Sequence, residues 1–197
     1  GHACQEELKI IHALTKPRFF IPLHGEQRML QIHSQLAQDM GIDRIHDFMK
    51  PFGFGQITGI DLVGEARGIL PSREWKQRRF KQRWAQGDTI SIGIGQGYNA
   101  FTILQLAHAV ATLANDGIVM KPHLVKKIIN SKTGEEEIVA KDPVDVIPLK
   151  KENVNFIKRA MQDVTQKGTG RAIFAGAPYT VGGKTGTSQK NRDAWFM

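Results

Sequence analysis

Near its C-terminal end the sequence reads Val181-Gly182-Gly183-Lys184-Thr185-Gly186-Thr187. Residues 179–187 predict a strand, in which alternate side chains such as Lys184 and Gly186 share one face. A glycine on an exposed strand edge lets a second backbone come close, and a peptide can add to such an edge as a further strand. A lysine ammonium and threonine hydroxyls beside it can hold a carboxylate through charge-assisted hydrogen bonds. We therefore expect Lys184, Thr185, Gly186 and Thr187 to bind a carboxylate.

The triplet Lys-Thr-Gly is short, and the chain contains it twice. The second copy, Lys132-Thr133-Gly134, lies between two strand candidates at residues 124–130 and 137–140. Such a position is typical of a hairpin turn, so we predict no binding role for this copy. The assignment at Lys184 therefore depends on the sequence around it.

The rest of the pattern combines helices with hairpin strands. Apolar residues recur at helical spacing over residues 26–40 and from Val154 to Val164. Residues 102–115 are apolar around most of the helix circumference, which predicts a largely buried helix. A further strand is expected to start at Asp193. Because helices and hairpins do not alternate regularly, the sequence indicates an α+β architecture.

The composition sets limits on function. The formal net charge is +8, and much of the excess lies between Arg67 and Arg83. A basic run can bind nucleic acid, but without a recognised reading motif it is weak evidence. We interpret it as a solvated segment held to the core by Trp75 and Trp84. The chain contains no apolar run of 18 residues that would predict a membrane-spanning helix, and the single Cys4 excludes an internal disulfide.

The composition also changes along the chain. Four of the seven histidines fall within the first 33 residues, whereas glycine becomes frequent from Gly53 onward. This difference suggests two segments of different origin, with a border near Gly41, where a glycine can end a helix.

The second segment contains a series of short motifs in a characteristic order and spacing. They are Phe52-Gly53-Phe54-Gly55, Thr58-Gly59-Ile60-Asp61-Leu62, Gly64-Glu65, Leu70-Pro71-Ser72, Gln86-Gly87-Asp88-Thr89, Gly93-Ile94-Gly95-Gln96-Gly97, Thr102-Ile103-Leu104-Gln105-Leu106-Ala107, Ala114-Asn115-Asp116-Gly117, Lys121-Pro122-His123-Leu124, Gly168-Thr169-Gly170, Lys184-Thr185-Gly186-Thr187 and Asp193-Ala194-Trp195-Phe196. Over residues 42–197 they resemble the C-terminal part of the transpeptidase domain of class B penicillin-binding proteins. Arg73-Glu74-Trp75-Lys76-Gln77 resembles the elongation type from Gram-negative bacteria.

The resemblance implies a fold, an activity and partners. The fold would be part of a β-lactamase-like domain, an antiparallel sheet flanked by helices. The activity would be peptidoglycan D,D-transpeptidation, with a stem peptide or a β-lactam bound at Lys184, Thr185, Gly186 and Thr187, and no cofactor. The parent family implies membrane and cell-elongation proteins as partners, a place on the bacterial inner membrane facing the periplasm, and no nucleic acid.

The same resemblance exposes a missing part. Enzymes of this family use a serine nucleophile in Ser-Xaa-Xaa-Lys, and a second motif, Ser-Xaa-Asn, assists proton transfer. The serines here are Ser34, Ser72, Ser91, Ser131 and Ser188, and none has a lysine three positions later or an asparagine two positions later. We therefore expect no catalytic residue in the chain, and an inactive fragment of a longer enzyme.

The first 41 residues resemble a different family. The stretches that carry this resemblance are Gly1-His2-Ala3-Cys4-Gln5-Glu6-Glu7-Leu8, Lys16-Pro17-Arg18-Phe19-Phe20-Ile21-Pro22-Leu23-His24-Gly25-Glu26 and Arg28-Met29-Leu30. They are similar to ribonuclease J, a two-metal nuclease with a metallo-β-lactamase/β-CASP fold, in which the position of His24 is a metal ligand. The main histidine cluster of that family is absent, and one imidazole cannot hold a catalytic metal pair, so we predict no metal.

Three functional interpretations stay open at this point. We expect a chimeric chain, with residues 1–41 from a nuclease and residues 42–197 from a transpeptidase. The principal function is then penicillin or stem-peptide binding. The alternatives are a remnant of an RNA-processing metallo-nuclease and a non-catalytic peptide-binding module.

Overall fold

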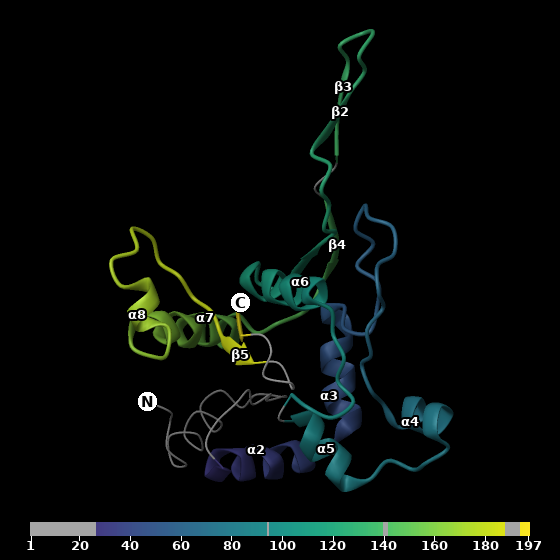
Figure 1. Cartoon of the computed structure of the whole chain (residues 1–197), viewed down its shortest axis with the longest axis vertical. Helices are drawn as coiled ribbons and strands as arrows, with labels where there is room; N and C mark the ends of the chain where they lie inside the picture. Colours follow the sequence, from purple (N-terminus) through teal and green to yellow (C-terminus); the bar gives the residue numbers. More distant parts are fainter. Residues whose placement is uncertain (1–26, 94, 140–141, 188–193) are drawn as a thin grey trace.

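The computed structural model describes residues 27–93, 95–139, 142–187 and 194–197 (Figure 1). The helices are α2 (Gln27–Met40), α3 (Ile42–Met49), the 3-10 turn η1 (Lys50–Phe52), α4 (Arg73–Phe80), α5 (Gln86–Gly93), α6 (Ile103–Ala114), α7 (Lys151–Gln166) and α8 (Arg171–Phe174). The strands are β1 (Ile118–Met120), β2 (Lys127–Ile129), β3 (Glu136–Ile138), β4 (Pro143–Val146), β5 (Thr185–Thr187) and β6 (Ala194–Phe196). No helix among these residues is long and apolar enough to cross a membrane.

One core cluster lies where α2, α3 and α5 meet. Its buried members are Ala37, Met40, Ile42, Ile45, Met49 and Ile92. Gly41 separates α2 from α3 with a φ of 75°, a conformation that glycine adopts without steric cost. A Cβ on Gly93 would collide with the Cβ of Ala37, so glycine at this position allows α5 to approach α2 closely.

A second core cluster joins α6 to the β1–β4 pair. It contains Phe52, Ala109, Val119 and Ile147. At the start of α6, the Thr102 hydroxyl accepts a hydrogen bond from the Gln105 N–H, and the Gln105 side chain accepts one from the Thr102 N–H. This reciprocal capping box satisfies two N–H groups that a helix start would otherwise leave without partners.

The predicted helices are confirmed with shifts of a few residues, but the predicted burial of residues 102–115 is wrong. The buried side of α6 carries Gln105, Ala109 and Thr112, while Ile103 is 46% exposed and Ala107 is also exposed. An all-round apolar helix needs neighbours on every side, and the described residues cover only part of its circumference.

The α+β class with antiparallel strands is confirmed, but the described strands form three separate pairs rather than one sheet. The pairs are β1–β4, β2–β3 and β5–β6. The predicted hairpin around Ser131 is confirmed as β2–β3, which extends away from the other elements in Figure 1. The predicted strand over residues 179–187 is shorter than expected, because β5 covers only Thr185–Thr187 and its hydrogen bonding extends back only to Lys184.

The long connection between η1 and α4 lacks regular structure but is fixed by hydrogen bonds. The buried Gln105 side chain donates to the carbonyl oxygens of Gln56 (2.6 Å) and Arg67 (2.7 Å). The Asp61 carboxylate accepts from the N–H groups of Val125 (2.8 Å) and Leu124 (2.7 Å), and these bonds lower the pKa of Asp61. Both ends and the tip of the connection are thereby held in place.

The basic segment predicted to be solvated is partly engaged in the fold. Trp75 and Trp84 are half-buried, and Lys76 is buried against Asp88. The hydrogen bond from Lys76 to Asp88 raises the pKa of the lysine, which keeps the ammonium charged beside its partner carboxylate.

Candidate functional site

The candidate site is the strand that follows Gly182 and Gly183. Within β5, Thr185 pairs with Phe196 and Gly186 with Trp195 of β6. The hydrogen bonding continues to Lys184, whose N–H donates to the Met197 carbonyl oxygen (2.7 Å) and whose carbonyl oxygen accepts from the Met197 N–H (3.2 Å). Since β6 is the only strand paired with β5 among the described residues, the opposite edge of β5 has no strand beside it there.

The glycines of the motif have different surroundings. A Cβ on Gly183 would collide with the Met197 carbonyl oxygen and the Phe196 ring, whereas nothing lies within 4 Å of the corresponding position on Gly186. The Gly183 N–H also donates to the Met161 carbonyl oxygen of α7 (3.0 Å). Gly183 therefore allows close contact inside the protein, while Gly186 leaves open space.

Lys184 is a half-buried cation. Its ammonium donates a hydrogen bond to the Thr185 carbonyl oxygen (2.5 Å), and no carboxylate forms an ion pair with it within the described part of the chain. Burial lowers the pKa of Lys184 below its ordinary value, because desolvation disfavours the charged form. A carboxylate that binds beside the Lys184 ammonium would stabilise its charged form.

Helix α7 contacts the segment before β5, and helix α8 packs against β6. The Thr165 hydroxyl lies 2.5 Å from the Val181 carbonyl oxygen, at the start of the glycine-rich run. The Phe174 ring of α8 contacts the Phe196 ring of β6, with centroids 4.8 Å apart. Sequence reasoning did not find these supporting residues, since the apolar periodicity of residues 154–164 predicted a helix but not its neighbours.

The described serines include two with clear structural roles. Ser72 caps α4, accepting from the Trp75 N–H (3.1 Å) and donating to Glu74 (2.9 Å). Ser91 donates to the Gly87 carbonyl oxygen one turn earlier in α5 (3.2 Å). Neither arrangement resembles a nucleophile beside a lysine base. Ser188 lies outside the described residues.

The second Lys-Thr-Gly triplet is confirmed as a turn. The Asn130 side chain accepts from the N–H groups of Lys132 (2.9 Å) and Thr133 (3.3 Å), and Gly134 has a φ of 73°. An Asn side chain that accepts from the backbone two residues on is a common turn device. The two copies of the triplet therefore have different structures.

The metal-ligand position inferred from ribonuclease J, His24, lies outside the described residues. Within the described ranges, no group of three or more His, Cys, Asp or Glu side chains could hold a metal ion. The described residues therefore offer no cluster of metal ligands that could complete a site with His24.

Comparison with known proteins agrees with this geometry. Residues 31–196 match the family model described as "Penicillin binding protein transpeptidase domain". The "Peptidoglycan D,D-transpeptidase MrdA" of Haemophilus influenzae is 47% identical over 160 residues, which cover 79% of this chain and 24% of that protein. Residues 1–46 match a second model, "Zn-dependent metallo-hydrolase RNA specificity domain", so the two matches overlap over residues 31–46.

Solved structures show the same similarity. Pseudomonas aeruginosa PBP2 in complex with WCK 5153 aligns with a TM-score of 0.73 and 42% identity, covering 85% of this chain and 38% of that one. PBP2 from the Helicobacter pylori complex with MreC aligns with a TM-score of 0.65 and 29% identity, covering 80% and 28%. The chain spans about a quarter of the length of the curated relatives it matches. On the family match over residues 31–196 and on these alignments, the chain belongs to the penicillin-binding protein transpeptidase domain family.

Proposed function

We propose that β5 and Lys184 bind the terminal carboxylate of a peptidoglycan stem peptide, or the carboxylate of a β-lactam, as part of peptidoglycan D,D-transpeptidation. The observation that carries this proposal is the half-buried Lys184, which has no carboxylate partner among the described residues and lies next to the open edge of β5. A buried charge without a counter-ion is costly, so an arriving carboxylate gains more here than on an exposed surface.

Each residue of the motif has a proposed role. The ammonium of Lys184 and the hydroxyl of Thr185 hold the carboxylate through charge-assisted hydrogen bonds. Gly186, with open space around it, lets the peptide backbone approach as an added strand. The Thr187 N–H points at the substrate carbonyl oxygen, which becomes an oxyanion when that carbon is attacked.

Acyl transfer itself requires a group that this sequence lacks. In transpeptidation a serine hydroxyl attacks the peptide carbonyl, the terminal D-alanine leaves, and an amine of a neighbouring strand then takes the acyl group from the serine. No serine of this sequence lies in Ser-Xaa-Xaa-Lys. We therefore expect the chain to bind its ligand reversibly, without forming an acyl-enzyme.

The test compares Lys184 with Lys132, because each begins a Lys-Thr-Gly triplet but only Lys184 lies beside β5. Titration with a D-alanyl-D-alanine peptide should show saturable binding that Lys184→Ala weakens by roughly tenfold or more, the size of a lost charge-assisted hydrogen bond. Lys132→Ala, in the exposed turn, should leave the affinity unchanged. Equal weakening by both variants would mean that only general charge matters and would refute the proposal.

Covalent labelling provides an independent check. Incubation with a fluorescent penicillin should leave no label on the chain after denaturing electrophoresis, because no acylating serine is present. Label that persists and maps to one serine would contradict the expected absence of a nucleophile.

For the parent protein we extend the proposal to partners and location. The Helicobacter pylori relative was solved in complex with MreC, and this supports elongation proteins as partners of the intact enzyme. We place that enzyme at the inner membrane facing the periplasm. The partner assignment can be tested with a full-length protein that includes residues 42–197. It should co-purify with the MreC of the same organism.

A second candidate concerns residues 1–41. The match of residues 1–46 to an RNA specificity domain favours a nuclease origin for this segment, joined to the transpeptidase part within residues 31–46. Any surviving function there would be RNA binding, since a single metal-ligand position cannot support catalysis. Salt-sensitive binding of single-stranded RNA that disappears when residues 1–26 are removed would support this candidate; no difference between the two chains would exclude it.

A further inference from the structure

A second polar site lies between α3 and α4 and shares no residue with β5. It is a cavity of about 630 Å³ lined by His46, Lys50, Ser72, Glu74, Gln77 and Arg78. It is open to solvent, because Lys50, Glu74, Gln77 and Arg78 are all exposed. Of its six lining residues, four can carry a charge.

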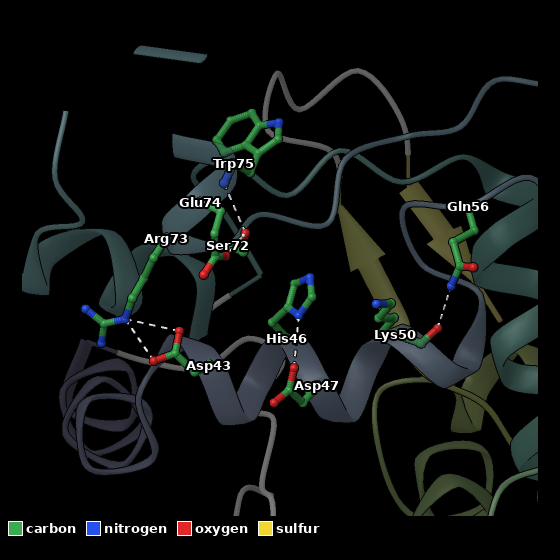
Figure 2. A network of polar contacts seen from close by, with 9 residues as sticks. All are labelled: Asp43, His46, Asp47, Lys50, Gln56, Ser72, Arg73, Glu74 and Trp75. Carbon is green, nitrogen blue, oxygen red and sulfur yellow. Dashed lines mark hydrogen bonds and ion pairs between the residues drawn. The ribbon is translucent and has the colours of Figure 1, made fainter. Parts of the chain in front are cut away.

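Helix geometry explains why these side chains converge. On α3, His46 lies one turn after the buried Ile42 and is half-buried at the edge of the buried side. Lys50 follows one turn later, at the start of η1, and is exposed. Figure 2 shows both rising from the helix on the side of Ser72 and Glu74. On α4, Glu74 and Arg78 are likewise four residues apart and share a side.

The carboxylates around this cavity already have partners. Asp43 accepts two hydrogen bonds from the Arg73 guanidinium (2.8 and 3.1 Å). Asp47 lies 3.3 Å from the His46 ring nitrogen. Glu74 accepts from its own N–H and from the Ser72 hydroxyl, and these bonds hold the pKa of Glu74 below its ordinary value.

Two cations in the cavity form no close ion pair among the described residues, although the Arg78 charge contributes to the lowered pKa of Glu74. Within the described ranges, neither the Lys50 ammonium nor the Arg78 guanidinium has a carboxylate oxygen at ion-pair distance. Arg79, Lys81 and Arg83 follow closely in the sequence and add to the positive potential around α4, which attracts anions. With Lys50 and Arg78 beside the single lining carboxylate of Glu74, the cavity keeps a net positive charge and hydrogen-bond donors.

The arrangement of these donors indicates the ligand. The Arg78 guanidinium on α4 and the Lys50 ammonium on η1 can contact different oxygens of one multiply charged anion, and the Gln77 amide adds neutral donors. We propose that the α3–α4 cavity binds a phosphate or pyrophosphate group, independently of the β5 site. Such a group could reach the protein on a soluble phosphate ester or on a phospholipid head group.

Two arginines of α4 provide a matched test. Arg78 lines the cavity, whereas Arg79 does not and lies near the Phe80 ring, 5.9 Å from its centroid. Inorganic pyrophosphate titrated into the whole chain at low ionic strength should bind saturably and shift the NMR signals of the His46 ring. Arg78→Ala should weaken this binding by roughly tenfold, while Arg79→Ala should change it by less than about threefold.

A second pair of variants keeps the test valid if Arg78→Ala fails to fold. Lys50→Ala should weaken pyrophosphate binding, and Lys132→Ala in the distant turn should not. Equal effects of Arg78→Ala and Arg79→Ala would overturn the proposal, as would a titration without saturation or with unchanged His46 signals.

Vesicles distinguish the two sources of phosphate. Binding to phosphatidylglycerol but not phosphatidylcholine vesicles, if weakened by Arg78→Ala and displaced by pyrophosphate, would identify a lipid head group as the ligand. Saturable pyrophosphate binding without preference for phosphatidylglycerol would instead identify a soluble phosphate ester. In both cases Lys184→Ala should have no effect, so the outcome is separable from that of the peptide titration.

Discussion

At the scale of single residues, the motif around Lys184 combines tight and open positions. Gly183 has the Met197 carbonyl oxygen and the Phe196 ring against it, and Gly186 two residues later has no neighbour within 4 Å of its missing Cβ. The same residue type thus serves contact inside the fold at one position and access from outside at the other. Lys184 lies between them, half-buried and with its pKa lowered by that burial.

Two alanine substitutions should separate these roles. Gly183→Ala should lower the free energy of unfolding by about 1–3 kcal/mol, because the new methyl group overpacks a site bounded by backbone. Gly186→Ala should change it by less than about 0.5 kcal/mol but weaken D-alanyl-D-alanine peptide binding. Urea denaturation and peptide titration of both variants measure the two effects. A similar loss of stability in both would contradict the different surroundings of the two glycines.

At the scale of elements, α6 acts as the anchor for an irregular connection. Gln105 is fully buried, and its amide bonds to the carbonyl oxygens of Gln56 and Arg67 bring the two ends of that connection onto the helix. A Cβ on Gly68 would collide with the Gln105 side chain, so a glycine there is needed for the approach. A polar residue on the buried side of an apolar helix is thereby explained.

Removing this anchor should have a local and a global effect. Gln105→Ala should cost about 1–3 kcal/mol of stability, since the carbonyl oxygens of Gln56 and Arg67 lose their donor. Residues 57–66 should become more sensitive to limited proteolysis. Gln166→Ala, on the exposed surface of α7, is the control and should change neither property. An intact cleavage pattern in the Gln105 variant would show that the other bonds, among them those of Asp61, are sufficient to hold the connection.

At the scale of the whole molecule, α2 belongs to the body of the fold. Ala37 is buried against Gly93 of α5, and Met40 is part of the same core cluster. The transpeptidase match accordingly begins at residue 31, within α2. The division at residue 41 stays a prediction about origin, but the helix before it fills a position in the core.

Truncation should show where the folded unit begins. A chain starting at residue 27 should keep cooperative unfolding, whereas one starting at residue 42 should lose about 2–5 kcal/mol or fail to fold, because the core loses Ala37 and Met40. In the full chain, Ala37→Leu should cost about 1–3 kcal/mol by overpacking, and Gln35→Leu on the exposed side should be near neutral. Equal urea midpoints for the two truncated chains would exclude a role for α2.

Sequence reasoning performed well where a signal is local. The helices over residues 26–40, 102–115 and 154–164 follow from apolar periodicity, and the turn at Lys132 follows from its flanking strands. It failed on the extent of the strand before Thr185 and on the burial of Ile103, because both depend on which other segments lie alongside. The supporting roles of Met161, Thr165 and Phe174 had no sequence signal, since they arise from contacts of α7 and α8 with distant strands.

The sequence by itself determined the family, the α+β class and the absence of a Ser-Xaa-Xaa-Lys nucleophile, because these depend on the order and identity of residues along the chain. Only the tertiary structure decided which glycine of the motif is enclosed and that Lys50 and Arg78 share one cavity. Burial and unpaired charge are properties of contacts between distant segments. They exist only once α3 lies beside α4 and β5 beside β6.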